Sequence, residues 1–457
     1  MRATVPDNVI IERLQVSERA AARSGWYSSR TLAPPSSVRI VACALALALA
    51  AVAPRPAPAQ DTARTSADSL AERLRRAEEA IELLREQLAT QAASSVQSAS
   101  RVRVDIFGRV LMNGFSNSAS VNNADVPLFV RPRDDGRGDR RGRGATIRQT
   151  SLGISVTVSR VLGGEFNGEL HTDFFGGQQP STGGRHFPLL RVRTARGTVR
   201  WSRAELLFGQ EVPLVVGLNP VSVASFGTPE FVAAGNLWLW LPQVRATAEL
   251  GTAARLAIQG AVLAPTSGDP AMPFDTELDA AELSRRPYLQ ARLRSRWGGE
   301  EAPGEIGIGV HRGWLRRDDG SRVTSEAVAV DARIPLGARV ELRGEAYVGR
   351  ALRGLGGGGI GQNLTTDGSP VRDRGGWAQL VVRPSTILEF GTGCGVADPR
   401  DANLPAGRLR NVACEGHVTA RPAGPLLAGL TYRHQRTTYP AGAVSNHHVN
   451  VALGFEF

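Results

Sequence analysis

The sequence of 457 residues predicts an all-β fold: a transmembrane antiparallel β-barrel of about sixteen strands, preceded by a short α-helical coiled coil. Three observations predict it. From residue 101 onward, apolar and polar residues alternate in runs that Gly, Pro, Asp and Asn separate. The last of these runs ends at an aromatic residue, Phe457. An apolar leader and a heptad-patterned segment precede the alternating region.

Residues 1–59 are interpreted as a leader whose functional part is a signal peptide over 38–59. Arg39 supplies the positive charge, 40–53 is apolar, and Ala57-Pro58-Ala59 is typical of a cleavage site. The apolar run is too short to span a bilayer comfortably as a helix. We therefore expect export across an inner membrane, with translation starting near Val38.

Residues 60–100 are predicted to form a periplasmic coiled coil and its linker. Apolar residues recur with alternating spacings of four and three, which is the heptad pattern of a coiled-coil seam. The seam consists of Leu70, Leu74, Ala77, Ile81, Leu84 and Leu88. So short a coiled coil needs partner helices, which favours an oligomer. The alternative is a single amphipathic helix lying on the barrel or on the cell wall.

Residues 101–457 are predicted to form the barrel itself. No stretch here is apolar over 18 residues, which excludes helical membrane spans. In the last run Val449, Val451 and Leu453 share one face, while His448 and Asn450 share the other. Clear alternation covers 166–174, 289–297, 339–348 and 448–457, and weaker copies start near 103, 147, 189, 203, 241, 254, 304, 323, 376, 386, 409 and 425.

Alternation alone also describes a soluble sandwich, but three features favour a membrane barrel. So many strands would make an unusually large sandwich. The polar face carries arginines and carboxylates, as a water-filled lumen does. The terminal Phe strand resembles the assembly signal of bacterial outer-membrane proteins. Aromatic residues near strand ends predict an aromatic girdle: Trp201, Trp238, Trp240, Trp297, Trp314, Trp377 and Tyr432.

The net charge of +11 comes from arginine alone, because the sequence contains no lysine. No basic helix with interleaved aromatics appears, so nucleic acid is not an expected partner. Arginines that alternate with the apolar residues of a strand fall on its polar face, which we call the inward parity. They predict a set of pore-lining residues: Arg103, Arg109, Arg191, Arg193, Arg292, Arg294, Arg296, Arg339 and Arg343. Acids of the same parity nearly balance them. Arginine ladders favour anions at a constriction; alternatively, they pair with neighbouring carboxylates and brace the wall.

The long segment 213–239, between the predicted fifth and sixth strands, is the best candidate for a loop that folds into the barrel. Alternatively, its apolar residues pack at a trimer interface. Cys394 and Cys414 fall on the outward face of facing strands, so a cross-strand disulfide is predicted. Two buried free thiols are the alternative. No His or Cys stands at metal-ligand spacing, and neither a metal nor a cofactor is expected.

Short motifs make the chain resemble the DcaP-like trimeric porins. They are Val104-Asp105-Ile106-Phe107-Gly108, Arg148-Gln149-Thr150-Ser151-Leu152-Gly153, 168–176 and Leu207-Phe208-Gly209-Gln210-Glu211. Thr150-Ser151 stands where the family usually has a second arginine. The resemblance implies a homotrimer that passes small anionic or dicarboxylic solutes. Phosphate-selective porins are a similar, rival family.

The sequence thus predicts an outer-membrane porin for passive diffusion of small, preferably anionic solutes, with outer-membrane lipid and further copies of the chain as partners. One alternative is a non-conducting barrel that tethers the envelope through its periplasmic helix. The other is an outer-membrane hydrolase, for which no Ser/His/Asp set has supporting context.

Overall fold

The computed structural model describes residues 102–133, 141–177, 187–251, 255–269, 277–299, 303–400 and 402–457, the backbone of 95–97, and six positions between 75 and 85. The chain divides into two units, Met1–Ala80 and Ile81–Phe457. The six separate positions have helical backbone. The predicted signal peptide, and the heptad seam apart from Ile81, lie outside the described residues, so both stay predictions.

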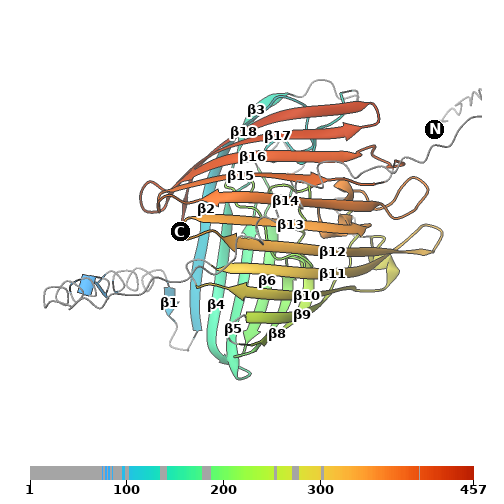
Figure 1. Ribbon diagram of the computed structural model, residues 1–457. Coiled ribbons are helices and arrows are strands. Elements are labelled where there is room, and N and C mark those ends of the chain that lie inside the picture. The colour runs from blue at the N-terminus through green and yellow to red at the C-terminus, as the bar shows by residue number, and fades with distance from the viewer. Residues whose placement is uncertain are drawn as a thin grey trace, which may run out of the picture. The chain divides into compact units, whose positions relative to one another are not determined.

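The second unit is a closed antiparallel β-barrel (Figure 1). Its strands are β1 (Ser95–Gln97), β2 (Val102–Asn117), β3 (Gly142–Thr146), β4 (Ser151–Val161), β5 (Gly164–Asp173), β6 (Arg191–Arg200), β7 (Ala204–Glu211), β8 (Leu241–Leu250), β9 (Arg255–Leu263), β10 (Tyr288–Trp297), β11 (Gly304–Arg316), β12 (Arg322–Pro335), β13 (Val340–Arg350), β14 (Arg372–Val382), β15 (Leu388–Ala397), β16 (Arg410–Ala420), β17 (Leu426–Tyr439) and β18 (Gly442–Glu456). Three 3-10 helices lie in loops: η2 (Glu282–Ser284), η3 (Arg353–Leu355) and η4 (Gly358–Ile360).

The described strands make a wall of sixteen, as the alternation predicts. β3 and β4 pair with successive parts of β2, so they form one barrel strand interrupted at 147–150. β18 pairs with β2 from Glu456 opposite Arg109 to His448 opposite Asn117, which closes the barrel. The closure leaves no strand edge within the wall, and a bilayer demands this because its core cannot satisfy free backbone groups. β1 adds a short pairing to the start of β2.

The two faces of the wall are those of a membrane barrel. Outward-facing Ile106, Leu293 and Val451 expose 57%, 44% and 46% of their surface, whereas inward-facing Asn113, Gln379 and His448 are buried. This apolar-outside, polar-inside arrangement is the reverse of a soluble core. It suits a surface solvated by hydrocarbon. No helix among the described residues is long and apolar enough to span a bilayer.

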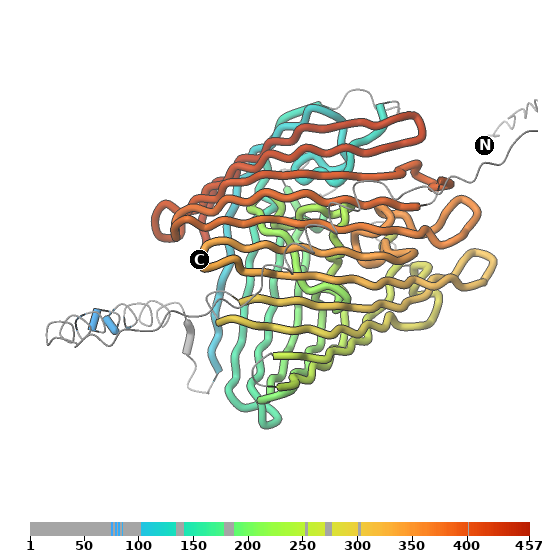
Figure 2. The backbone as a smooth tube through the Cα atoms, in the orientation of Figure 1, coloured from blue at the N-terminus to red at the C-terminus, as the bar shows by residue number. Residues whose placement is uncertain are grey.

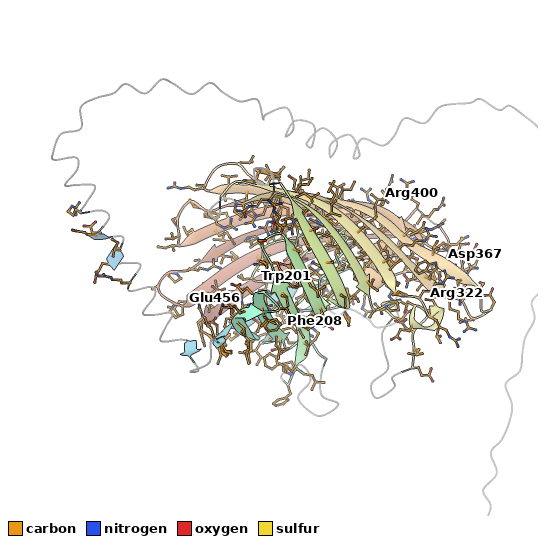
Figure 3. All side chains as sticks on the ribbon, turned by 90° about the horizontal axis from the view of Figure 1, so that it is seen from below. Trp201, Phe208, Arg322, Asp367, Arg400 and Glu456 are labelled. Carbon is orange, nitrogen blue, oxygen red and sulfur yellow. A yellow bond between two sulfur atoms is a disulfide. The ribbon has the colours of Figure 1, made fainter. Side chains whose placement is uncertain are left out.

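The two ends of the barrel differ in the length of their connections. One end has short turns such as 162–163 and 201–203, while the other has long loops at 118–141, 212–240, 264–287 and 351–371. Figure 3 shows Trp201 and Glu456 toward the first end, and Asp367 and Arg400 toward the second. In barrels of this kind the short turns face the periplasm. We refer to the turn end and the loop end below.

The prediction of an aromatic girdle is wrong for two of its residues, Trp377 and Trp238. Trp377 lies on β14 with 4% of its surface exposed, and its Nε1 donates to inward-facing Glu345 at 3.1 Å. Trp238 is buried in the 212–240 loop, where its Nε1 donates to the Gly356 carbonyl. Their position in the sequence suggested strand ends, but both rings pack inside the barrel. Trp297 and Trp314 do lie at strand ends.

Candidate functional site: the barrel lumen

Loop 212–240 folds into the barrel, as its length predicts; the winding tube appears inside the wall in Figure 2. The inward side chains of distant strands hold it there. Val215 N donates to Gln290 Oε1 at 2.9 Å. Gln379 on β14 both accepts from Val221 N and donates to Val221 O, each at 2.8 Å. The loop is thus fastened to the wall by hydrogen bonds to its backbone.

Small residues on the wall allow this close approach. A Cβ on Gly309 of β11 would lie 2.2 Å from Val215 O, and one on Gly395 of β15 would lie 2.3 Å from Ala234 O. In the loop, Gly235 has a positive φ of 102°, and its Cβ would lie 2.4 Å from Gly376 N. Only glycine suits that conformation without cost. The sequence is therefore built for contact between this loop and β11–β15.

A buried ion pair anchors the middle of the loop. Arg433 on β17 pairs with Glu230 of the loop and donates to Ser225 Oγ and, at 3.0 Å, to Pro127 O. The Arg433 and Glu230 side chains are 3% and 0% exposed. Moving the loop away would leave two buried charges without each other, which is costly. This pair therefore fixes the position of the loop relative to β17 and to the 118–141 loop.

The inward face of β11–β17, which we call the covered wall, carries most of the buried acids. Each has partners among the described residues. Asp331 pairs with Arg292, and Glu341 with Arg343 and Arg333. Glu345 accepts from Trp377 Nε1 and from Leu237 N of the loop. The acids of this wall are Asp331, Glu341, Glu345, Asp373, Glu389 and Glu415, each exposing less than a tenth of its surface.

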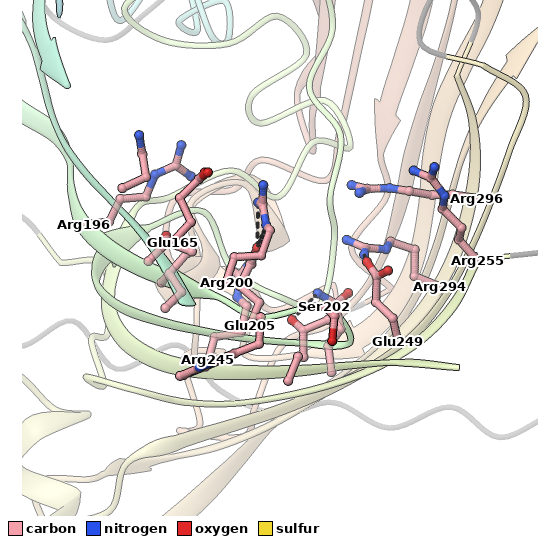
Figure 4. A pocket seen from close by; sticks show the side chains of 17 residues that line it. Glu165, Arg196, Arg200, Ser202, Glu205, Arg245, Glu249, Arg255, Arg294 and Arg296 are labelled. Carbon is pink, nitrogen blue, oxygen red and sulfur yellow. Dashed lines mark hydrogen bonds and ion pairs between the residues drawn. The ribbon is translucent and has the colours of Figure 1, made fainter. Parts of the chain in front are cut away.

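The inward face of β5–β10, which we call the open wall, borders a cavity of about 560 Å³ near the turn end (Figure 4). Six arginines and three glutamates line this cavity, a formal excess of three positive charges. They are Arg196, Arg200, Arg245, Arg255, Arg294 and Arg296, with Glu165, Glu205 and Glu249. Two of these arginines pair with acids just outside the cavity lining, Arg196 with Glu169 and Glu211 and Arg296 with Glu305.

A β-bulge on β6 concentrates arginine on the open wall. The register between β5 and β6 shifts between His171 and Thr172, leaving Arg193 opposite no partner. The shift reverses the parity of the strand. Arg191, Arg193 and Arg196 therefore all turn inward, although strict alternation would place Arg196 on the other face. Arg196 bridges Glu169 and Glu211.

Arginines and aromatic rings meet where loop 212–240 approaches β2 and β6. The Arg109 and Arg193 guanidinium carbons lie 4.0 and 4.2 Å from the centre of the Phe226 ring. Arg193 also lies 4.9 Å from the Trp240 ring and 3.6 Å from Asp173. Its Nε and Nη1 are buried without a hydrogen-bond partner. The two rings and Asp173 therefore hold this guanidinium in place.

The predicted pore-lining residues fall into three groups. Arg109, Arg191, Arg193, Arg294 and Arg296 face the lumen beside the loop or the cavity. Arg292 and Arg343 are structural: Arg292 is 4% exposed, and Arg343 donates to the Asn219 carbonyl of the loop at 2.9 Å. Arg103 pairs with Asp105 near the turn end. Arg339 lies exposed in the turn before β13, so it is at the rim rather than on the wall.

Four important arginines were missing from the predicted set. Arg196 was hidden by the bulge, and Arg200 by its position at a strand end. Arg433 lies on the face of β17 opposite to that of Leu430 and Tyr432. This alternation was visible in the sequence and would have predicted an inward Arg433. Arg148 pairs with Asp125 from the interruption between β3 and β4, where no alternation exists to read.

Cys394 and Cys414 lie directly opposite each other on β15 and β16 and are joined by a disulfide, with their Cα atoms 4.0 Å apart. They share the outward face with Phe390, as parity predicts. Among the described residues, no group of three or more His, Cys, Asp or Glu side chains could hold a metal ion.

The fold is that of known outer-membrane channels. The outer membrane channel DcaP of Acinetobacter baumannii matches 80% of this chain and 100% of its own, with a TM-score of 0.59 and 17% identity. An anion-selective porin from Comamonas acidovorans matches 78% of this chain and 100% of its own, with a TM-score of 0.51 and 12% identity. OprB of Pseudomonas putida matches 78% of this chain and 94% of its own, with a TM-score of 0.50 and 10% identity. No family model and no curated protein matches the sequence. The resemblance seen in the short motifs is confirmed at the level of the fold.

Proposed function

We propose that this protein is an outer-membrane porin that passes small anionic solutes by passive diffusion. The distribution of lumen charge carries the proposal. Acids of the covered wall are buried and partnered, while the cavity along the open wall has a formal excess of three positive charges. A solute in the lumen therefore meets arginine, and carboxylate or phosphate groups match the planar donor pattern of arginine.

The outer membrane is the location that this fold supports. The apolar outward band and the sixteen-stranded closure need a bilayer, and single-chain barrels of this kind occur in bacterial outer membranes. The three matched structures are channels or porins with the same fold. Sixteen strands also leave a lumen wider than side chains alone can fill.

We infer that the anion pathway passes between Arg193 and the cavity. Arg193 Nε lies 3.6 Å from Asp173, and Arg245 on the neighbouring stretch of the open wall donates to the Val212 carbonyl and to Gln243 Oε1 rather than to a carboxylate. Further along, Arg294 lies 3.7 Å from Glu249, longer than a hydrogen bond. Among the described contacts, none of these three arginines donates a short hydrogen bond to a carboxylate, so an anionic solute is the partner that their charge favours.

Planar-bilayer recording tests the proposal directly. The full chain, purified from membranes and added to a lipid bilayer, is expected to give stepwise conductance. In a salt gradient, its reversal potential is expected to have the sign for anions. A reversal potential with the sign for cations would remove the anion preference. Folded protein that inserts but gives no conductance would overturn the porin assignment in favour of a tethering barrel.

We further propose a homotrimer supported by the periplasmic helix. The heptad seam at 70–88 favours helix association, and the barrel wall offers an apolar surface for protomer contact. Crosslinking in native membranes, with and without residues 61–100, tests this. Trimer bands in the full chain that weaken on deletion are expected. Equal trimer yield in both proteins would assign assembly to the barrel alone, and monomer in both would contradict the trimer.

A further inference from the structure

Charged side chains form a row across the outward face near the loop end of β11–β14. Arg312, Glu326 and Arg350 lie directly opposite one another on β11, β12 and β13, and Arg372 on β14 lies opposite Arg350. They share the outward parity of Val310, Val328 and Val348, which are 48%, 45% and 54% exposed. Arg312, Glu326 and Arg350 are each two residues, about 7 Å, from an exposed valine. The row therefore begins where the apolar band ends.

Glu326 holds two of these arginines in place. Its Oε1 forms an ion pair with Arg312 Nη1 at 2.9 Å, and its Oε2 accepts from Arg350 Nη2 at 2.7 Å. The Arg312 and Arg350 side chains remain 57% and 41% exposed. One carboxylate shared by two arginines leaves a net positive charge. The positioned guanidinium groups keep N–H donors directed away from it, because each has five.

The charged row borders a groove of about 780 Å³ on the outer surface of the barrel. The apolar floor of the groove includes Leu289, Val310 and Val328, and its charged side includes Arg312, Arg350 and Arg372. Beyond Arg312 lies Trp314, whose ring is 5.8 Å from the Arg312 guanidinium carbon and 5.1 Å from that of Arg286. Aromatic and basic residues together are typical of the level of the lipid headgroups.

The groove thus combines three properties. It has an apolar surface facing hydrocarbon, two arginines for one carboxylate at the headgroup level, and the Trp314 ring beside Arg312 next to it. Arg312 and Arg350 share a single acid, Glu326. A purely structural ion pair would need only one arginine for this carboxylate. An amphiphile with acyl chains and an anionic headgroup satisfies all three properties.

We propose that this groove binds a phosphorylated glycolipid of the outer leaflet, with acyl chains along the valine floor and phosphate on Arg312 and Arg350. The binding rests on the proposed outer-membrane location and orientation of the barrel, but not on conduction. Arginine binds phosphate through paired N–H groups, which suits a headgroup held by two positioned guanidinium groups.

The test measures binding of two probes to the full chain in detergent by native mass spectrometry: lipid A with both phosphates, and the same lipid with both removed. Wild-type protein is expected to bind the phosphorylated probe at least about tenfold more tightly, the effect of one lost charge-assisted hydrogen bond. The double variant Arg312→Gln/Arg350→Gln is expected to lose this preference. Arg286→Gln, which alters no strand residue, is expected to weaken it in the same direction.

A matched double variant, Arg410→Gln/Arg436→Gln, removes two exposed outward arginines from β16 and β17 and is expected to leave the preference unchanged. Equal binding of both probes to the wild type, or full retention of the preference in Arg312→Gln/Arg350→Gln, would overturn the proposal. So would inorganic phosphate binding as tightly as the phosphorylated lipid. Conductance recorded on the same samples is expected to be unchanged, which separates lipid binding from channel function.

Discussion

The covered wall and the open wall of the lumen have similar sequences but opposite electrostatic roles. Both alternate arginine and carboxylate with apolar outward residues. On the covered wall, loop 212–240 and neighbouring arginines bury the acids, whereas the open wall exposes arginine to a cavity. A lumen with nearly balanced formal charges thus presents an unbalanced surface. Accessible charge, and not total charge, is what a passing ion senses.

The largest expected effect comes from releasing the loop that creates the covered wall. Arg433→Gln leaves Glu230 buried without its ionic partner, so it is expected to destabilise the barrel by about 3–5 kcal/mol. Because the loop then loses its anchor, single-channel conductance is expected to rise. Urea unfolding and planar-bilayer recording measure the two effects. Arg436→Gln, on the outward face of the same strand, is the control. Unchanged stability and conductance would show that the ion pair does not hold the loop.

A wall glycine gives a milder way to displace the same loop. In Gly309→Val the new Cβ would meet the Val215 carbonyl at 2.2 Å, so the loop must shift. Such overpacking costs about 1–3 kcal/mol. We expect higher conductance and weaker anion selectivity as covered acids become accessible. Gly260→Val on β9, with open space at its Cβ, is the matched control. If both substitutions had the same effect on conductance, the contact of residue 309 with the Val215 carbonyl would not be its cause.

Neutralising the open wall is expected to change selectivity with little change in stability. Arg193→Gln/Arg245→Gln removes one arginine that lies 3.6 Å from Asp173 and one that donates to Gln243 and the Val212 carbonyl rather than to a carboxylate. A unit charge at contact in water is worth about 1 kcal/mol, so the anion-to-cation permeability ratio is expected to fall about fivefold per charge. Reversal potentials in a salt gradient measure this. A ratio equal to that of the wild type would contradict the assigned pathway.

The smallest effect is expected from a single neutralised acid on the covered wall. Glu345→Gln keeps the size of a side chain whose carboxylate accepts from Trp377 Nε1 and Leu237 N. Because Glu345 is 4% exposed, the reversal potential is expected to stay within error of the wild type. The same recordings test this outcome. A shift as large as that of the open-wall variant would show that both walls face the pathway and would erase the distinction.

The fold was predictable because a barrel wall obeys a local rule. The period of two, together with turn residues, placed the strand starts at 241 and 304 where the structure has them, and the start at 339 one residue early. The same rule put Cys394 and Cys414 on one outward face. It failed at the β6 bulge, where one extra residue reversed the parity and concealed Arg196. It was also silent at Arg148, which lies in an interruption between two pairing segments.

The sequence by itself determined the wall: its strands, its closure at Phe457, and which residues face lipid, because side-chain alternation follows directly from the backbone pleat. The tertiary structure alone decided which charges remain accessible. Glu345 and Arg245 share the same inward parity, but the loop covers Glu345 while Arg245 lines the cavity. Burial depends on contacts between segments distant in the chain, as Glu230 with Arg433 shows. A local periodicity contains no information about such contacts.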